Sequence, residues 1–266
     1  MSAARRPDGR LDRRLTPVEG GWLGRPFAEM RSTLEASRLV MDPVMYGAGV
    51  PRGDGRPVLV LPGFLAGDES LWLLRAWLRR IGYQPVTCGF RFNVDCGNRA
   101  LERVERHAQD AHDRTGRRVA VIGHSRGGHF ARALAARRPD LVSHAISLGA
   151  DLQGMFGISA PTRAAVGLVR QTAAATGLTP EPACYRSRCT CGFVQAFGAE
   201  FPVDDVHLTS VYSKGDGVVR WQRAIVDEAE NVEITGSHVG LASNRKAFRV
   251  IGEALARPER AGADRH

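Results

Sequence analysis

The chain has 266 residues, of which 43% are hydrophobic and 24% charged, a composition typical of a globular protein with a sizeable buried core. Its formal net charge is +9, but arginines and acidic residues are interspersed. No basic block marks a nucleic-acid surface, although a weak attraction to anionic membrane surfaces remains open. We find neither an apolar run near the ~20 residues of a membrane span nor a secretory signal, so the sequence predicts a cytoplasmic protein.

The five cysteines lie in two loop regions, Cys88 and Cys96 in one and Cys184, Cys189 and Cys191 in the other. An odd number cannot all pair within one chain. The C-x4-C-x-C spacing has no nearby histidine and fits no standard zinc pattern, so we expect no bound metal. One or two disulfides that staple the loops and free thiols both remain open.

Hydrophobic periodicity and turn residues predict strands and helices that alternate along most of the chain. Strands are expected at residues 58–61, 84–88, 119–122, 145–148, 207–212 and 232–235. Helices are expected within 22–45, broken by Pro43, then at 70–81 with Asp68 as N-cap, 97–114, 130–138, 221–226 and 246–256. This alternation predicts an α/β fold with a doubly wound, mostly parallel sheet. Residues 1–20 are expected to form a flexible arm, and residues 21–266 a single domain.

Residues 151–202 interrupt the alternation. The segment is long for a connection between two strands, and it mixes apolar residues with prolines, glycines and three of the cysteines. Inserted segments of this length are often functional, so we expect a cap or lid, with an amphipathic helix over residues 162–172. The alternative is that its apolar face packs on the core.

A G-x-S-x-G pattern stands between the predicted strand at 119–122 and the helix that follows. Its members are Gly123, Ser125 and Gly127. A sharp turn from strand to helix lifts a serine hydroxyl clear of the sheet, and glycines on both sides leave room for the strained serine backbone. A glycine-rich turn with a chance serine would share the five-residue pattern, but the strand and helix around it favour a nucleophile.

A serine hydroxyl becomes a good nucleophile when a histidine takes its proton and an acid holds that histidine in one tautomer. Asp216 lies in a glycine-flanked turn after the strand at 207–212, and His238 follows the next strand. Each alone could be an ordinary loop residue. The chain order of serine, acid and histidine at the ends of successive strands favours a catalytic triad. The reserve acids are Asp204, Asp205 and Asp227, of which Asp227 is the strongest.

The remaining histidines fit the role of the base less well. His124 adjoins the serine and is expected to point elsewhere, and His207 precedes the acid in the chain. The others fall on helices or strands in the wrong half of the sheet: His107, His112, His129 and His144.

An acyl-transfer site also needs two N–H donors for the oxyanion. The amide of Arg126, directly after the serine, is one candidate. The amide of Phe64, in the Pro62-Gly63 turn after the first strand, is the other. An ordinary β-turn could have the same Pro62-Gly63 sequence. The position of this turn after the first strand, ahead of the serine motif, favours a role in the oxyanion hole.

Four stretches together resemble the α/β-hydrolase superfamily, and within it the bacterial lipases and esterases that carry a G-H-S-x-G-G turn. They are L-P-G-F at 61–64, G-H-S-R-G-G at 123–128, Y-S-K-G-D-G-V-V at 212–219 and G-S-H-V-G at 236–240. The serine argues against dehalogenases, which use aspartate there, and against polyester synthases, which use cysteine.

The resemblance implies an esterase or lipase that cleaves small-molecule or lipid esters through an acyl-enzyme, with no cofactor. Phe64, Leu65 and the region of Trp72 would line the entrance to its pocket. An acyltransferase or a thioesterase could use the same residues, and some proteins with this fold are non-catalytic binding proteins. The sequence does not indicate the oligomeric state.

Overall fold

A computed structural model describes residues 23–24, 26–155, 157–175 and 190–260 of the chain. The predicted N-terminal arm (1–20) lies outside the described residues, as do Cys184 and Cys189. Among the cysteines that the structure describes, the buried Cys88 is a free thiol.

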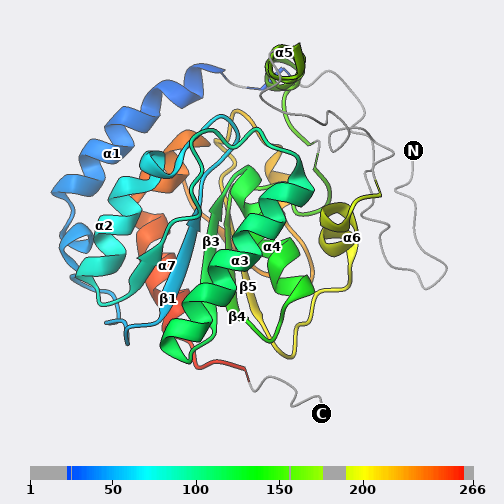
Figure 1. Cartoon of the computed structure of the whole chain (residues 1–266). Helices are drawn as coiled ribbons and strands as arrows, with labels where there is room; N and C mark the ends of the chain where they lie inside the picture. The colour runs from blue at the N-terminus through cyan, green and yellow to red at the C-terminus, as the bar shows by residue number, and fades with distance from the viewer. Residues whose placement is uncertain (1–22, 25, 156, 176–189, 261–266) are drawn as a thin grey trace.

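The fold is built on a parallel sheet (Figure 1), whose six strands run in the order β2-β1-β3-β4-β5-β6. The strands are β1 (Pro57–Leu61), β2 (Gln84–Val86), β3 (Val119–His124), β4 (Val142–Leu148), β5 (His207–Tyr212) and β6 (Glu230–Glu233). This confirms the predicted α/β class with a doubly wound parallel sheet.

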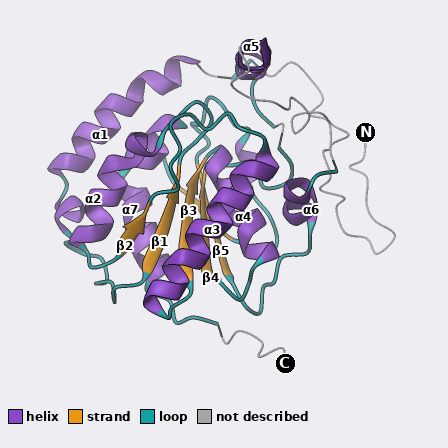
Figure 2. Ribbon diagram, viewed as in Figure 1, coloured by secondary structure: helices purple, strands orange, loops and turns teal. Residues whose placement is uncertain are grey.

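Helices cover both faces of this sheet (Figure 2). The α-helices are α1 (Ser32–Met41), α2 (Trp72–Arg80), α3 (Gly97–Thr115), α4 (Arg126–Arg137), α5 (Ala160–Ala175), α6 (Gly192–Gly198) and α7 (Arg245–Leu255). Short 3₁₀ helices are η1 (Pro26–Arg31), η2 (Pro43–Tyr46), η3 (Asp68–Leu71), η5 (Trp221–Ala224) and η6 (Val239–Ser243). Helices α3, α4 and α6 pack on one face, and α1, α2 and α7 on the other.

The apolar strand runs of the sequence supply both halves of the core. Successive residues of a strand point to opposite faces, so Leu59 and Leu61 pack toward α3 and α4, whereas Val58 and Val60 pack toward α2 and α7. All four are essentially inaccessible to solvent. A strand that is buried on both faces has no solvent-facing positions for polar residues. This explains why the sequence of β1 is a continuous apolar run.

The order of the strands places a crevice at one end of the sheet. From β1 the chain moves outward to β2 and then returns to β3 on the opposite side of β1. The loops after β1 and β3 therefore diverge, and ligands of open α/β sheets bind at such a point. The pairing of Leu61 with Gly123 brings the Pro62–Gly63 turn directly beside Ser125.

Several predicted boundaries were wrong. Asp68 is not the N-cap, because its carboxylate accepts hydrogen bonds from the amides of Gly89 and Phe90, and the cap position belongs to Gly67. Helix α4 begins at Arg126, directly after the serine.

Toward the C-terminus, the element predicted at 221–226 is the single 3₁₀ turn η5. The last strand lies at Glu230–Glu233, two residues earlier than its apolar stretch indicated. This strand is at the edge of the sheet, where polar residues such as Glu230 and Asn231 can take part in pairing.

The two described helices of the inserted segment 151–202 differ in how they are placed on the fold. Helix α6 packs on α4, with Phe193 and Phe197 buried in the core. Helix α5, which contains the predicted helix at 162–172, stands at the end of the sheet that carries Ser125 (Figure 1), with Leu168 63% exposed.

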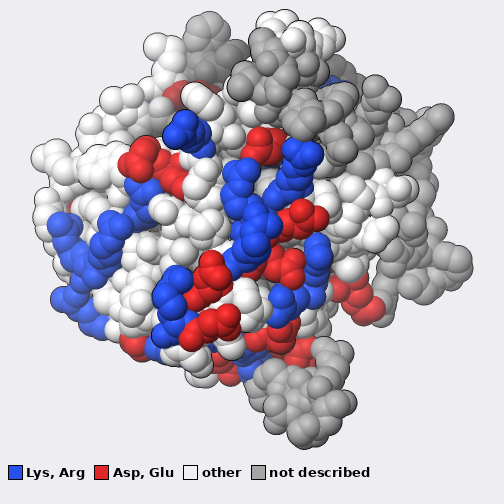
Figure 3. All heavy atoms as spheres, viewed as in Figure 1, with Lys and Arg blue, Asp and Glu red and all other residues white. Residues whose placement is uncertain are grey.

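Charges of both signs alternate over the face that α3 and α4 present in Figure 3. Ion pairs join Arg138 to Glu105 (3.1 Å) and to Asp140 (2.7 Å), and Arg103 to Asp95 (2.7 Å). This face therefore carries the interspersed charge that the sequence shows.

Candidate active site

Ser125 stands on a sharp turn between β3 and α4. Its backbone has φ 52° and ψ −119°, a conformation that costs a non-glycine residue of order 1–3 kcal/mol. A Cβ atom on Gly123 would collide with the backbone of Gly127, and one on Gly127 would collide with the carbonyl of Leu61. The amide of Ser125 donates to the carbonyl of Leu148 (2.8 Å), so the neighbouring strand β4 helps to hold the turn.

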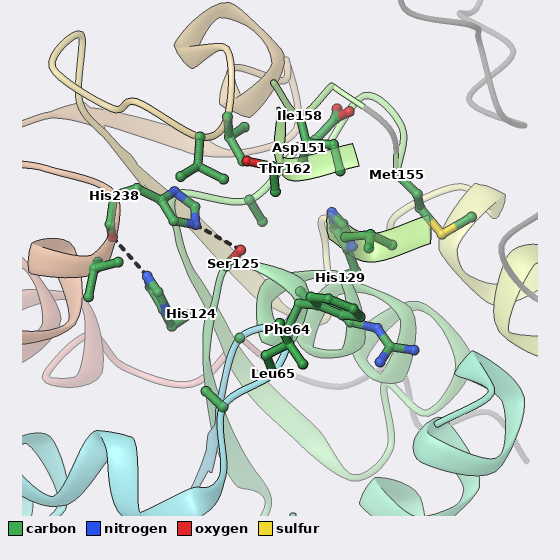
Figure 4. Close-up of a pocket in the computed structure, with 18 of the residues that line it drawn as sticks. Phe64, Leu65, His124, Ser125, His129, Asp151, Met155, Ile158, Thr162 and His238 are labelled. Carbon is green, nitrogen blue, oxygen red and sulfur yellow. Dashed lines mark hydrogen bonds between the residues drawn. The ribbon is translucent and has the colours of Figure 1, made fainter. Parts of the chain in front are cut away.

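The structure brings Ser125, His238 and Asp216 together from three loops at one end of the sheet. Figure 4 shows the first two, joined by a hydrogen bond. His238 Nδ1 donates to Asp216 Oδ2 (2.7 Å), because an ionised carboxylate can only accept. This leaves Nε2 as the acceptor for the Ser125 hydroxyl, at 2.9 Å. The other oxygen of Asp216 accepts from the amides of Val218 and Val219, both at 2.8 Å, which fixes the carboxylate in the turn.

The environment of His238 favours its protonated form. Burial of the imidazole opposes protonation, but the negative charge and the hydrogen bond of Asp216, together with the charge of Glu29, raise the pKa of His238 above its usual value. The ring is therefore prepared to accept a proton from the serine.

His124 directs its ring to the backbone of the His238 loop rather than to Ser125 (Figure 4). Its Nε2–H donates to the carbonyl of His238 (2.9 Å), and the two ring centres are 5.1 Å apart. Burial, followed by the nearby charge of His238, lowers the pKa of His124 to about 4, so this imidazole is neutral at pH 7. It supports the position of His238, a role that the sequence did not reveal.

Phe64 and Arg126, whose amides are the two predicted oxyanion donors, line the cavity that contains Ser125. The fully buried Asn93 connects the loop of Phe64 to α4. Its Nδ2 donates to the Pro62 carbonyl (2.8 Å), its backbone amide donates to the Ala66 carbonyl (3.0 Å), and its Oδ1 accepts from the Arg126 guanidinium (2.9 Å). The sequence did not reveal this role of Asn93.

A cavity of about 360 Å³ opens beside Ser125. Its walls are mostly apolar and include Leu65, Met155, Ile158, Val166, Phe193 and Val219. The region of Trp72 contributes to the lining through Ser70 and Leu71, whereas Trp72 itself is 57% exposed and does not line the cavity. Trp72 begins α2, and the first turn of that helix directs it to solvent.

Two polar side chains also border the cavity. His129 lies one helical turn after Ser125, a spacing that places both on the same side of α4, and this i, i+4 relation was the signal that could have found it. Burial, followed by the charge of Arg126, lowers the pKa of His129 to about 3. Asp151 is buried and pairs with Arg223 (2.8 Å), and burial raises its pKa although the arginine opposes the shift.

The reserve acids lie elsewhere. Asp227 is exposed, and Asp204 and Asp205 border a separate surface hollow. Within the described part of the chain, no group of three or more potential ligands gathers to hold a metal ion. Over the same residues, we find no helix both long and apolar enough to cross a bilayer.

One family model matches part of the chain. The family model for palmitoyl protein thioesterases matches residues 92–196, a stretch that includes Ser125 but neither Asp216 nor His238. No curated protein matches the sequence at a significant level.

Solved structures match over most of the chain. The mature lipase BlEst2 of Bacillus licheniformis is 14% identical with a TM-score of 0.54, over 78% of this chain and 94% of the lipase. Lipase B of Aspergillus fumigatus is 14% identical with a TM-score of 0.55, over 82% of this chain and 57% of that lipase. The thioesterase domain from the curacin biosynthetic pathway is 18% identical with a TM-score of 0.50, over 76% and 90% of the two chains. Together with the sheet order, these likenesses show that the chain has the α/β-hydrolase fold, as its sequence motifs predicted.

Proposed function

We propose that the protein is a serine hydrolase that cleaves carboxylic esters through an acyl-enzyme. The observation that carries this proposal is the continuous line of hydrogen bonds from Ser125 through His238 to Asp216. Ser125 Oγ attacks the ester carbonyl while its proton passes to His238 Nε2. Asp216 holds the imidazole in the required tautomer and stabilises the imidazolium that forms.

The backbone amides of Phe64 and Arg126 are the proposed donors to the oxyanion. Arg126 is the first residue of α4, so its amide belongs to the positive end of the helix dipole. When the tetrahedral intermediate collapses, the alcohol leaves with the proton from His238. His238 then takes a proton from water, the hydroxide attacks the acyl carbonyl, and Ser125 recovers its proton as the acid departs.

The apolar lining of the cavity suits an aliphatic or aromatic acyl group. Residues of the segment 151–202 contribute to its wall, among them Ile158 and Val166, which is consistent with a cap over the substrate. Thioesters are the second candidate substrates, favoured by the match to the palmitoyl protein thioesterase model and by the likeness to a thioesterase domain.

Hydrolysis of p-nitrophenyl esters from acetate to palmitate, with Ser125→Ala as control, tests the proposal. We expect the substitution to reduce turnover by about 10⁴-fold or more. Retained activity in Ser125→Ala would refute the nucleophile. Labelling by a fluorophosphonate probe separates an enzyme from a non-catalytic binding protein, because an inert serine does not react.

Matched oxygen esters and thioesters of one acyl chain separate the two substrate classes. A higher kcat/KM for the thioester would favour the second candidate. Product analysis with added alcohol would show whether the acyl group passes to an acceptor other than water.

A further inference from the structure

Glu29 joins the loops of the proposed acid and base. It lies on η1, close to the N-terminus, yet its carboxylate accepts three hydrogen bonds from backbone amides about two hundred residues later in the chain. Glu29 Oε1 accepts from the amides of Gly217 (3.1 Å) and His238 (3.0 Å). Glu29 Oε2 accepts from the amide of Val239 (2.8 Å).

These bonds add to the contacts between two loops that leave neighbouring strands and that the Ser213 hydroxyl also joins, through the carbonyl (2.6 Å) and amide (3.1 Å) of Gly236. Gly217 follows Asp216 in the loop after β5, whereas His238 and Val239 belong to the loop after β6. One carboxylate bonded to both loops helps to hold the acid and the base at a fixed distance. Hydrogen bonds to an ionised carboxylate are shorter and stronger than bonds between neutral groups.

Glu29 is also an anion beside the imidazole. The ionisable groups that face His238 are Asp216 from the loop after β5, Glu29 from η1 and His124 from the end of β3. His124 is neutral at pH 7, since burial and the charge of His238 lower its pKa to about 4. The positive charge that develops on His238 is therefore balanced by two carboxylates.

We propose that Glu29 is a positioning residue, which keeps the Asp216 and His238 loops in register and adds a second negative charge toward the imidazolium. This inference rests on the proposed serine-hydrolase function. It assigns to η1, a segment outside the sheet and its covering helices, a part in the proton transfer.

The test compares the pH dependence of kcat/KM in Glu29→Gln, Glu29→Asp and the wild-type enzyme. Glutamine keeps the shape of the side chain but removes its charge, which makes the imidazolium less stable, so His238 loses its proton at lower pH. We expect the acid limb of Glu29→Gln to move down by roughly half a pH unit or more, and the plateau rate to fall. Glu29→Asp keeps the charge but shortens the reach to the amides, so we expect a lower plateau with a nearly unchanged limb.

Glu35 offers a matched control. It lies on α1, one element later, and its carboxylate binds the amide (2.9 Å) and hydroxyl (2.7 Å) of Ser237, next to His238. We expect Glu35→Gln to lower the plateau without moving the acid limb. An equal shift in Glu35→Gln, or no shift in Glu29→Gln, would overturn the proposal.

Titration of the His238 imidazole by NMR gives a second readout that needs no turnover. A lower pKa in Glu29→Gln than in the wild-type protein is expected even if esters are not the substrate, and an unchanged value would overturn the proposal. Failure of the proposed function would appear separately, as ester hydrolysis that does not depend on Ser125. If Glu29→Gln does not fold, Glu29→Asp decides on its own: its acid limb should stay within about 0.2 unit of wild type, and a larger shift would count against the proposal.

Discussion

Replacing Asn93 by alanine tests whether the loop of Phe64 is held in place by polar contacts from outside the loop. Asn93 is inaccessible to solvent, and its side chain makes two hydrogen bonds, one to the Pro62 carbonyl and one from the Arg126 guanidinium. The loop needs such support because Leu65 has φ 62°, a left-handed conformation that leucine adopts only under constraint.

The size of the effect follows from these bonds. The bond to Pro62 joins neutral groups and contributes about 1 kcal/mol, and the bond from Arg126 involves a charge and contributes about 1.5–3 kcal/mol. The guanidinium retains its bonds to the backbone carbonyls of Asn93 and Asp95, both at 2.6 Å, so it keeps its place. We therefore expect Asn93→Ala to lower the free energy of unfolding by about 3 kcal/mol, or Tm by about 6–12 °C.

The expected effect on the reaction is separate from the loss of stability. Complete loss of one oxyanion donor costs about 10²–10³-fold in kcat. A loosened Phe64 amide should cost less, about 10–100-fold, with KM nearly unchanged, because the donor acts on the transition state. Steady-state kinetics on a p-nitrophenyl ester, together with the affinity for a boronic acid that mimics the oxyanion, measure this effect.

Asn231 provides the control, because its side chain also bonds to neighbouring backbone, at Val226 and Ala229, but at the amino end of β6. Asn231→Ala should lower Tm while kcat stays near the wild-type value. If Asn93→Ala loses stability but keeps kcat within twofold, the oxyanion loop does not depend on Asn93. An unchanged Tm would refute the hydrogen-bond argument itself.

Two further predictions concern the acid and the base. Asp216→Asn should reduce kcat/KM by about 10⁴-fold, because an amide neither fixes the tautomer of His238 nor stabilises its positive charge, and steady-state kinetics with a residual rate above one tenth would contradict it. The pH profile of kcat/KM should fall on the acid side with a midpoint above the usual pKa of histidine, because Asp216 outweighs the effect of burial on the pKa of His238. Protonated His238 cannot accept the serine proton, so activity is lost as pH falls through this pKa, and a midpoint well below 6 would contradict the argument.

The parts of the fold that the sequence predicted are those with a local signal. The runs at β1 and β3 are apolar over consecutive residues because both faces of these strands are covered. Ser125 was identified from the glycines of its own turn, and Asp216 and His238 from their order at successive strand ends. The structure places these residues within hydrogen-bond distance, while their catalytic role stays a prediction.

The parts that sequence reasoning missed depend on contacts between distant segments. Glu29 binds amides that lie 188 to 210 residues away in the chain. Asn93 reaches Pro62 across 31 residues, and Asp68 reaches Gly89 across 21 instead of capping its own helix. A short polar side chain near a helix start can bind the backbone of its own helix or that of a distant segment, and tertiary packing determines which.

The supports on the two sides of the candidate site share one property, which is that they bind main-chain atoms. Glu29 binds the amides of His238 and Val239, and Asn93 binds the carbonyls of Pro62 and Ala66 in the loop of Phe64. Neither contact uses the side chains of Leu65 or Val239, which line the cavity from those same loops. Substitutions at these two positions can therefore reshape the pocket while the backbone that carries Phe64 and His238 stays fixed. Backbone support and pocket lining can be separate because these loops leave the same end of the sheet, where the polar contacts hold their main chains together.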